Sequence, residues 1–310
     1  MADIEVSAAA GAGFKLIGAR PVSVFIWGLF MVLLVVGPSM VLFATILPQF
    51  IDMMREQAAH PDAPPRLAAA MPIINRMGAA YSVMGLGGIL SAAILNAAVY
   101  RAVIEPRNRG FAYLRFGMRE IWLVVLYVAQ FLLWFAMIVL AVIAVGGISA
   151  MAAHFEGRSW GAVAGVVAGL LAAFTLIVVA LRLSMAAPMT FADGEFRLFQ
   201  SWRLTRGHAW QIFLVALLLV VILIGVGIVV NVVERLTLFP LMFSYMADPH
   251  AADNFRATFN QPPEIWLKTA WPFILAACVG ISIYTGVMRS IVAAPWATVY
   301  RMLKGDAATA

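Results

Sequence analysis

Six long segments of this chain contain no aspartate, glutamate, lysine or arginine and consist almost entirely of apolar residues. Each is close to the roughly 20 residues that an α-helix needs to cross the hydrocarbon core of a bilayer. Because the segments are apolar on all sides, they do not suit the amphipathic helices of a soluble bundle. The chain is 64% hydrophobic and only 12% charged, so most of it must face lipid or other apolar helices. The predicted spans are Val24–Leu47, Gly78–Tyr100, Ile121–Val145, Gly161–Leu181, Ala209–Val233 and Thr269–Met288.

A short pattern follows three of these spans: an arginine and, five or six residues later, a proline. It occurs at Arg101–Pro106, Arg182–Pro188 and Arg289–Pro295, and recurrence at such intervals indicates an internal repeat. We therefore predict an all-α integral membrane protein with six transmembrane helices arranged as three tandem helical hairpins. Each repeated arginine is expected near the membrane boundary, a turn or two before a proline that ends the span. The single membrane domain covers residues 1–310, with repeats over 13–106, 111–188 and 195–303.

Basic residues are distributed unevenly between the two ends of the predicted spans. Of the 21 lysines and arginines, two thirds lie in the two termini or in the even-numbered connections between spans. An excess of basic residues beside helix ends marks the cytoplasmic side, so both termini are predicted to be cytoplasmic. Any one of these residues could serve only as a topology signal. The residues on this side are Lys15, Arg20, Arg101, Arg107, Arg109, Arg115, Arg119, Arg182, Arg197, Arg203, Arg206, Arg289, Arg301 and Lys304.

A stretch rich in aromatic and basic residues precedes each predicted hairpin, at residues 13–20, 111–119 and 196–206. Aromatic rings favour the membrane interface, and arginines there attract anionic headgroups with about 1 kcal/mol each. We therefore predict an interfacial amphipathic helix before each hairpin. Membrane lipids, anionic ones above all, are the predicted partners, and no nucleic acid is expected.

The last of these stretches carries a family resemblance. Ser201–Trp210, together with the preceding Arg182–Pro188 element, resembles a tract of bacterial six-helix membrane proteins: the YciC-like family and the membrane domain beside some glycerophosphodiester phosphodiesterases. The resemblance implies a multi-pass protein of the bacterial inner membrane, and the tract is not catalytic in that family. The phosphodiesterase domain is a large soluble barrel, and no polar segment of this chain is long enough to form one. The resemblance therefore implies no enzyme activity.

The candidate binding residues are the repeated arginines and the basic part of the third stretch. At the end of a span an arginine can bind lipid phosphate, an exposed helix carbonyl, or both, because its planar guanidinium donates several hydrogen bonds. We expect Arg182 and Arg289 to contact helix ends and either phosphate or the stretch that begins the next repeat. The full set of predicted phosphate or helix-end contacts is Arg101, Arg182, Arg289, Arg203, Arg206 and Trp202.

Polar residues inside the spans are few and uncharged, which argues against ion-coupled transport because a coupling ion needs an ionisable partner. Asn96 and Gln130 are predicted to bridge helices by hydrogen bonds. No nucleophile–base grouping and no phosphate-binding glycine loop occurs in the sequence, so neither catalysis nor a cofactor is predicted. Small residues at a spacing of four predict close helix packing, either within the chain or in a homodimer, along Gly161, Gly165, Gly169 and Ala173.

Each predicted external turn contains a histidine with an acid two residues away: His60, His154 and His250. Imidazole and carboxylate suit a divalent metal, but loops collect polar residues in any case and these turns differ in length. We therefore predict no metal and name the histidines only as external candidates. The third turn, residues 236–268, is rich in aromatic residues and is the expected protein-partner surface.

Two classes of function follow. The first is a non-enzymatic scaffold or accessory protein of the membrane, whose basic cytoplasmic face binds anionic lipid or a partner. The second is an uncoupled facilitator that carries a lipid or an amphipathic solute through a groove between hairpins. The absence of charged residues in the spans favours the first, whereas a lipid-accessible cavity would favour the second.

Overall fold

The computed structural model describes residues 4–40, 42, 46, 53, 67–107, 110–247 and 263–307, and every regular element among them is helical. Six of the helical segments are long and apolar enough to cross a membrane, as the sequence predicts. The short elements are α1 (Val6–Ala10), α2 (Ala12–Ala19), a π-helical turn (Val32–Val36), a 3-10 turn (Phe111–Tyr113), α8 (Ala186–Asp193) and α9 (Gln200–Leu204). The longer ones are α3 (Pro21–Met31), α5 (Leu67–Ile104), α6 (Met118–Glu156), α7 (Arg158–Leu183), α10 (Ala209–Ala247) and α12 (Pro263–Ala307).

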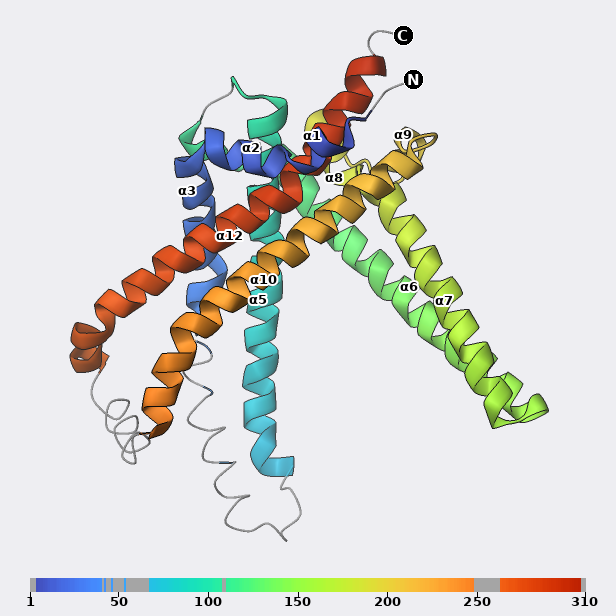
Figure 1. The fold of residues 1–310 in the computed structure, drawn as a ribbon, viewed down its shortest axis with the longest axis horizontal. Helices are drawn as coiled ribbons and strands as arrows, with labels where there is room; N and C mark the ends of the chain where they lie inside the picture. Colours follow the sequence, from blue (N-terminus) through green and yellow to red (C-terminus); the bar gives the residue numbers. More distant parts are fainter. Residues whose placement is uncertain are drawn as a thin grey trace.

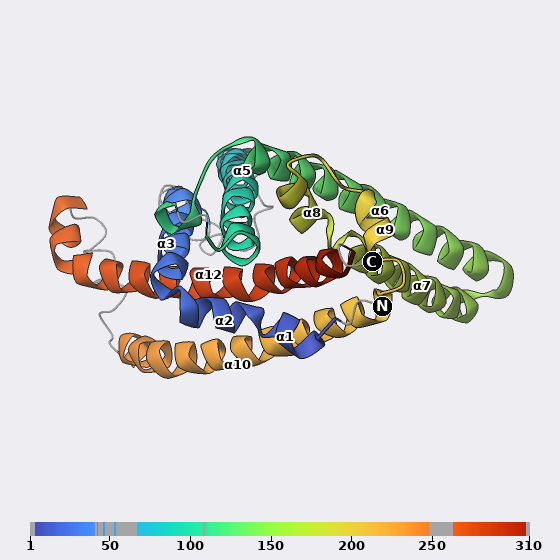
Figure 2. The ribbon, with the colours of Figure 1, turned by 90° about the horizontal axis from the view of Figure 1, so that it is seen from above.

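The long helices converge at the end of the molecule that carries both termini and diverge away from it (Figure 1). The short elements α1, α2, α8 and α9 all lie at this convergent end. Seen from above, α1 and α2 lie between α10 and α12, while α6 and α7 run side by side away from the other helices (Figure 2). The buried core is accordingly concentrated where the helices meet.

The α6–α7 hairpin packs chiefly on itself. Ser149 of α6 donates a 2.8 Å hydrogen bond to the carbonyl of Gly161 on α7, and a Cβ added to Gly161 or Gly165 would press against Ser149 or its neighbour Ala153. The first half of the predicted glycine ridge therefore packs within the chain, whereas a Cβ on Gly169 would meet nothing within 4 Å. No residue is fully buried between positions 127 and 156 or between 162 and 182, so lipid is the natural surrounding of this hairpin.

The closest helix crossing lies elsewhere, between α3 and α12. A Cβ on Gly28 would lie 1.6 Å from the Ser282 carbonyl oxygen, and one on Gly286 would lie 2.1 Å from the Val24 carbonyl oxygen. Only glycine permits backbones to approach this closely. The corresponding ridge on α12 consists of small, fully buried residues at a spacing of four: Ser282, Gly286, Ser290 and Ala294.

Only one of the three predicted interfacial stretches is helical over most of its length. Residues 13–20 do form a helix, α2. Residues 111–119 instead form a 3-10 turn with positive φ at Ala112 and Tyr113, followed by extended chain up to Gly117. Within residues 196–206 only the five residues of α9 are α-helical. In this stretch the backbone carbonyls of Ala112 and Tyr113 accept hydrogen bonds from the side chains of Trp27 and Arg101.

The prolines do not end every span. Pro106 follows the end of α5, and Pro188 lies in the first turn of α8, where its missing N–H costs nothing. Pro295, however, lies inside α12, which continues to Ala307. Arg289 therefore lies far from its helix end, unlike Arg101 and Arg182, and the three arginines do not occupy equivalent positions along their helices.

The third external turn is shorter than residues 236–268. Helix α10 extends to Ala247, and α12 begins at Pro263, because the apolar and aromatic residues there continue the helices. The rest of this predicted partner surface lies outside the described residues, as do His60 and His250.

Candidate functional site

The first repeated arginine, Arg101, is buried and forms an ion pair with another residue of the same chain, Glu120. Its Nη2 donates to Glu120 Oε1 at the start of α6, and its Nη1 donates to the Tyr113 carbonyl at 2.5 Å. The two charged side chains are 4% and 2% exposed. The second carboxylate oxygen of Glu120 accepts the Gly117 N–H at 2.9 Å and so caps α6. Arg101 therefore joins the first hairpin to the second and does not face lipid.

The turn at residues 111–113 is fixed by two side chains from the two helices of the first hairpin, α3 and α5. Trp27 Nε1 donates to the Ala112 carbonyl at 2.7 Å, while the next carbonyl accepts from Arg101. Backbone carbonyls that point at such partners cannot accept i+4 hydrogen bonds, which explains why this stretch is not a helix. The guanidinium groups of Arg101 and Arg119 lie 5.3 and 5.4 Å from the centre of the Phe191 ring, which belongs to α8.

The second repeated arginine, Arg182, contacts the stretch that begins the third hairpin. Its Nη1 donates to the Thr205 carbonyl at 2.9 Å, and its guanidinium lies 5.7 Å from the Trp202 ring centre. In return, Ser201 Oγ donates to the Arg182 carbonyl at 2.6 Å. Since Thr205 is the C-terminal cap residue of α9, Arg182 contacts a helix end.

Two of the three basic residues of this stretch, Arg203 and Arg206, are exposed at the convergent end of the molecule. Trp202 is also exposed, by 45%. Their positions are compatible with contact to headgroups, and the structure brings them near Arg182 but not near the other two repeated arginines.

The third repeated arginine, Arg289, has a different environment. It lies inside the α12 span, and its Nη1 is 3.5 Å from Asn96 Oδ1 on α5. Tyr100 and Tyr127 line the same space as Asn96. Asn96 Nδ2 in turn donates to Tyr127 Oη at 2.6 Å. Among the described residues, no carboxylate oxygen lies within 4 Å of this guanidinium.

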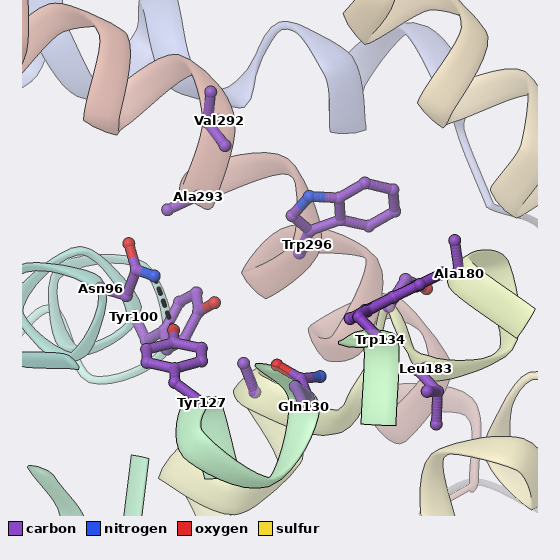
Figure 3. Close-up of a pocket in the computed structure, with 12 residues that line it drawn as sticks. Asn96, Tyr100, Tyr127, Gln130, Trp134, Ala180, Leu183, Val292, Ala293 and Trp296 are labelled. Atoms are coloured by element: carbon purple, nitrogen blue, oxygen red, sulfur yellow. Dashed lines mark hydrogen bonds between the residues drawn. The ribbon is translucent and has the colours of Figure 1, made fainter. Parts of the chain in front are cut away.

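A cavity of about 230 Å³ adjoins this cluster (Figure 3). We call it the Arg289 cavity. In Figure 3, Gln130 of α6 and Trp296 of α12 lie on opposite sides of the space, with Asn96 and Tyr127 on a third. Along α5, Asn96 lies five residues before Arg101, which is about 7.5 Å at the rise of an α-helix. The lining combines residues from all three hairpins: Asn96, Tyr100, Tyr127, Gln130, Trp134, Ala180, Leu183, Ser184, Ala187, Val292, Ala293 and Trp296.

Sequence reasoning identified Arg289, Asn96 and Gln130 but not the two tyrosines or the acid. Tyr127 lies one turn before Gln130 and hence on the same face of α6, a signal that was available. Glu120 was overlooked because it directly precedes the third span and reads as a helix-start residue. Its burial depends on the approach of α5, which no local pattern encodes.

The residues of the external metal hypothesis do not form a described site. His154 lies near the end of α6 and packs against the Phe155 ring, and its two predicted partners fall outside the described residues. No group of three potential metal ligands occurs among the residues that the structure describes. Comparison with known proteins gives no match to this chain among family models, curated proteins or solved structures.

Proposed function

We propose that this chain is a non-enzymatic membrane protein that binds the phosphate group of an anionic lipid in the Arg289 cavity. The observation that carries the proposal is an arginine within a membrane span without a described carboxylate partner. A charged side chain within a membrane span is costly unless it is paired. A lipid phosphate would supply the counter-charge that the neighbouring residues do not.

The chemistry of the cavity supports a phosphate ligand. Arg289 is not among the lining residues, but it adjoins the cavity through its contact with Asn96, which does line it. Its guanidinium offers a planar set of donors that matches two phosphate oxygens. Tyr100, Tyr127 and Gln130 carry further groups that can donate hydrogen bonds. Trp134 and Trp296 add apolar rings with one N–H each, a combination that suits the boundary between headgroups and acyl chains.

The surface beside the cavity supports a lipid rather than a soluble ligand. One turn after Tyr127, helix α6 exposes large apolar side chains: Phe131 by 62%, Leu132 by 58% and Phe135 by 62%. Acyl chains of a lipid whose phosphate lies in the cavity would pack along these side chains. A soluble phosphate ester would gain nothing from them.

The test is the lipid that the purified full-length protein retains, measured by native mass spectrometry from membranes of mixed composition. The wild type should retain anionic lipid, and Arg289→Gln should lose it by about tenfold to a hundredfold, the range expected for hydrogen bonds to a charged group. Tyr127→Phe should weaken retention less, because the charge remains.

Arg235→Gln is the matched control. Arg235 is an exposed arginine on α10 whose Nε donates to Asn231 Oδ1 at 2.8 Å. Its replacement removes the same charge as Arg289→Gln at a position that does not line the cavity. Equal anionic lipid on the wild type and Arg289→Gln would refute the proposal. Loss of lipid in both variants would refute it as well, because binding would then depend on overall charge.

The facilitator remains a second candidate, supported by one observation. The α6–α7 hairpin diverges from α5 and α12 beyond the cavity (Figure 1), so a bound lipid could leave along its exposed side chains. Reconstituted protein that moves a fluorescent anionic lipid between leaflets, with loss of this activity in Arg289→Gln, would favour the facilitator. Lipid retention without movement would favour the accessory protein.

A further inference from the structure

A second cavity lies at the convergent end of the molecule, further along α5 and α12 than the Arg289 cavity and with no lining residue in common with it. It has a volume of about 650 Å³, is open to the surface and is lined by α1 and α2, the last turn of α5 and the C-terminal part of α12. Three cations line it: Lys15, Arg20 and Arg301. We call it the terminal cavity. We infer that it binds a phosphate ester, and that this site is separate from the proposed lipid site.

The charge of the terminal cavity is unbalanced. Its lining residues include three formal positive charges and no aspartate or glutamate. No described residue forms an ion pair with any of the three. Arg301 Nη1 donates at 3.0 Å to the Val103 carbonyl, which holds the side chain in place and leaves its other N–H groups for a ligand.

The walls of the cavity are fixed by packing. Helix α2 lies directly on α12, because a Cβ on Gly13 would approach the Ile291 Cα to 2.6 Å. Leu16 of α2 is buried in the core where the hairpins meet, and Ala9 of α1 is buried in the neighbouring core cluster. The cations on α2 are thus carried by an anchored helix rather than by a free N-terminal segment.

An adjoining space extends the positive lining. Beyond Pro106, a volume of about 600 Å³ is lined by Arg107 and, again, by Arg301. The acid in that space, Glu105, forms an ion pair of 2.7 Å with Arg119. The electrostatic attraction for an anion therefore extends over both volumes.

The ligand chemistry follows from charge, size and lining. A phosphomonoester carries about −1.5 to −2 charges at neutral pH and accepts several hydrogen bonds, which matches two arginines and a lysine. The carbon part of the ligand would contact the apolar residues that share the lining, such as Leu16, Val103 and Met302. A lipid headgroup and a soluble phosphate ester present the same chemistry, so the experiment must distinguish these sources.

Binding can be measured on the purified full-length protein in neutral detergent, by its thermal shift with glycerol 3-phosphate and with inorganic phosphate at constant ionic strength. In parallel, the protein is placed in nanodiscs of phosphatidylcholine with or without phosphatidic acid. A shift with glycerol 3-phosphate in detergent identifies a soluble ligand class. Stabilisation by phosphatidic acid that persists in Arg289→Gln, without a shift by glycerol 3-phosphate, identifies a lipid headgroup in the terminal cavity.

The variant Arg20→Gln/Arg301→Gln should weaken the binding by about tenfold or more, since each arginine contributes charge-assisted hydrogen bonds. Arg158→Gln/Arg235→Gln is the matched control, because it removes two exposed charges that line neither cavity. Arg289→Gln should leave the response to glycerol 3-phosphate unchanged and lower only the response to phosphatidic acid, which separates the inference from the proposed lipid site.

The inference would be overturned if the cavity variant binds as the wild type does, or if the control loses binding equally. It would also be overturned if the wild type responds neither to glycerol 3-phosphate nor to phosphatidic acid. If the cavity variant fails to fold, Lys15→Gln is the substitute. Lys15 is exposed and forms no described side-chain contact, so its replacement should lower affinity without affecting stability.

Discussion

Breaking the Arg101–Glu120 ion pair should have the largest effect on stability of any single charge substitution in the described chain. Glu120→Gln leaves the guanidinium of Arg101 buried without a counter-charge. The remaining amide oxygen can accept from Arg101 or from the Gly117 N–H, but it cannot replace both carboxylate oxygens. Removal of one partner from a buried pair costs about 3–5 kcal/mol. We expect a loss of about 3 kcal/mol or more in the free energy of unfolding.

The size of this effect can be isolated with a double-mutant cycle in detergent, monitored by unfolding with a denaturing surfactant. Arg101→Met should cost about as much as Glu120→Gln, and the double variant much less than their sum, because it leaves no unpaired charge. The coupling should reach about 2 kcal/mol or more.

The pair formed by Arg119 and Glu105 provides an internal comparison. Its side chains are 41% and 30% exposed, so solvent screens the attraction, and its coupling should stay below about 1 kcal/mol. Similar couplings for the two pairs, or additive losses at Arg101 and Glu120, would show that burial of the first pair does not govern its energy.

Three further outcomes are expected. Gly28→Ala should destabilise the protein by about 1–3 kcal/mol in the same unfolding assay, because its Cβ would overlap an α12 carbonyl. Gly225→Ala is the control and should be neutral, because its Cβ would meet nothing within 4 Å. Equal losses for the two variants would refute the close crossing. Arg182→Gln should lower thermal stability in detergent by an amount close to one charge-assisted hydrogen bond, about 1.5–3 kcal/mol, and a wild-type melting temperature would mean that it is only a topology signal. Reporter fusions at Ala310 and within residues 60–66 should report opposite sides of the membrane, and the same side for both would exclude six spans.

The number and approximate placement of the spans could be predicted because each is an uninterrupted apolar run. That pattern depends only on composition, and the bilayer sets its length. Pro38 follows the π-helical turn Val32–Val36, and proline inside a helix commonly disturbs the preceding turn. The local pattern could not predict that α12 passes through Pro295, because neighbouring helices decide whether a helix tolerates a proline.

Helix packing was predictable only in part. The glycine ridge on α7 is visible in the sequence and half of it packs on α6. The tighter crossing of α3 and α12 depends on Gly28 and Gly286, which are isolated glycines about 260 residues apart in the chain. A ridge shows which face of a helix can be approached, but the partner helix is a property of the whole arrangement.

The candidate site shows why one sequence pattern can serve different purposes. Arg101, Arg182 and Arg289 share their spacing to a proline, yet the first is neutralised by an acid and the second ends on a backbone carbonyl. The third is accompanied by an amide and two tyrosines, with no described acid in reach. The energy of a buried charge depends on its partners rather than on its place in a repeat. The arginine whose partners within the chain leave its charge unbalanced is therefore the one expected to meet an external anion.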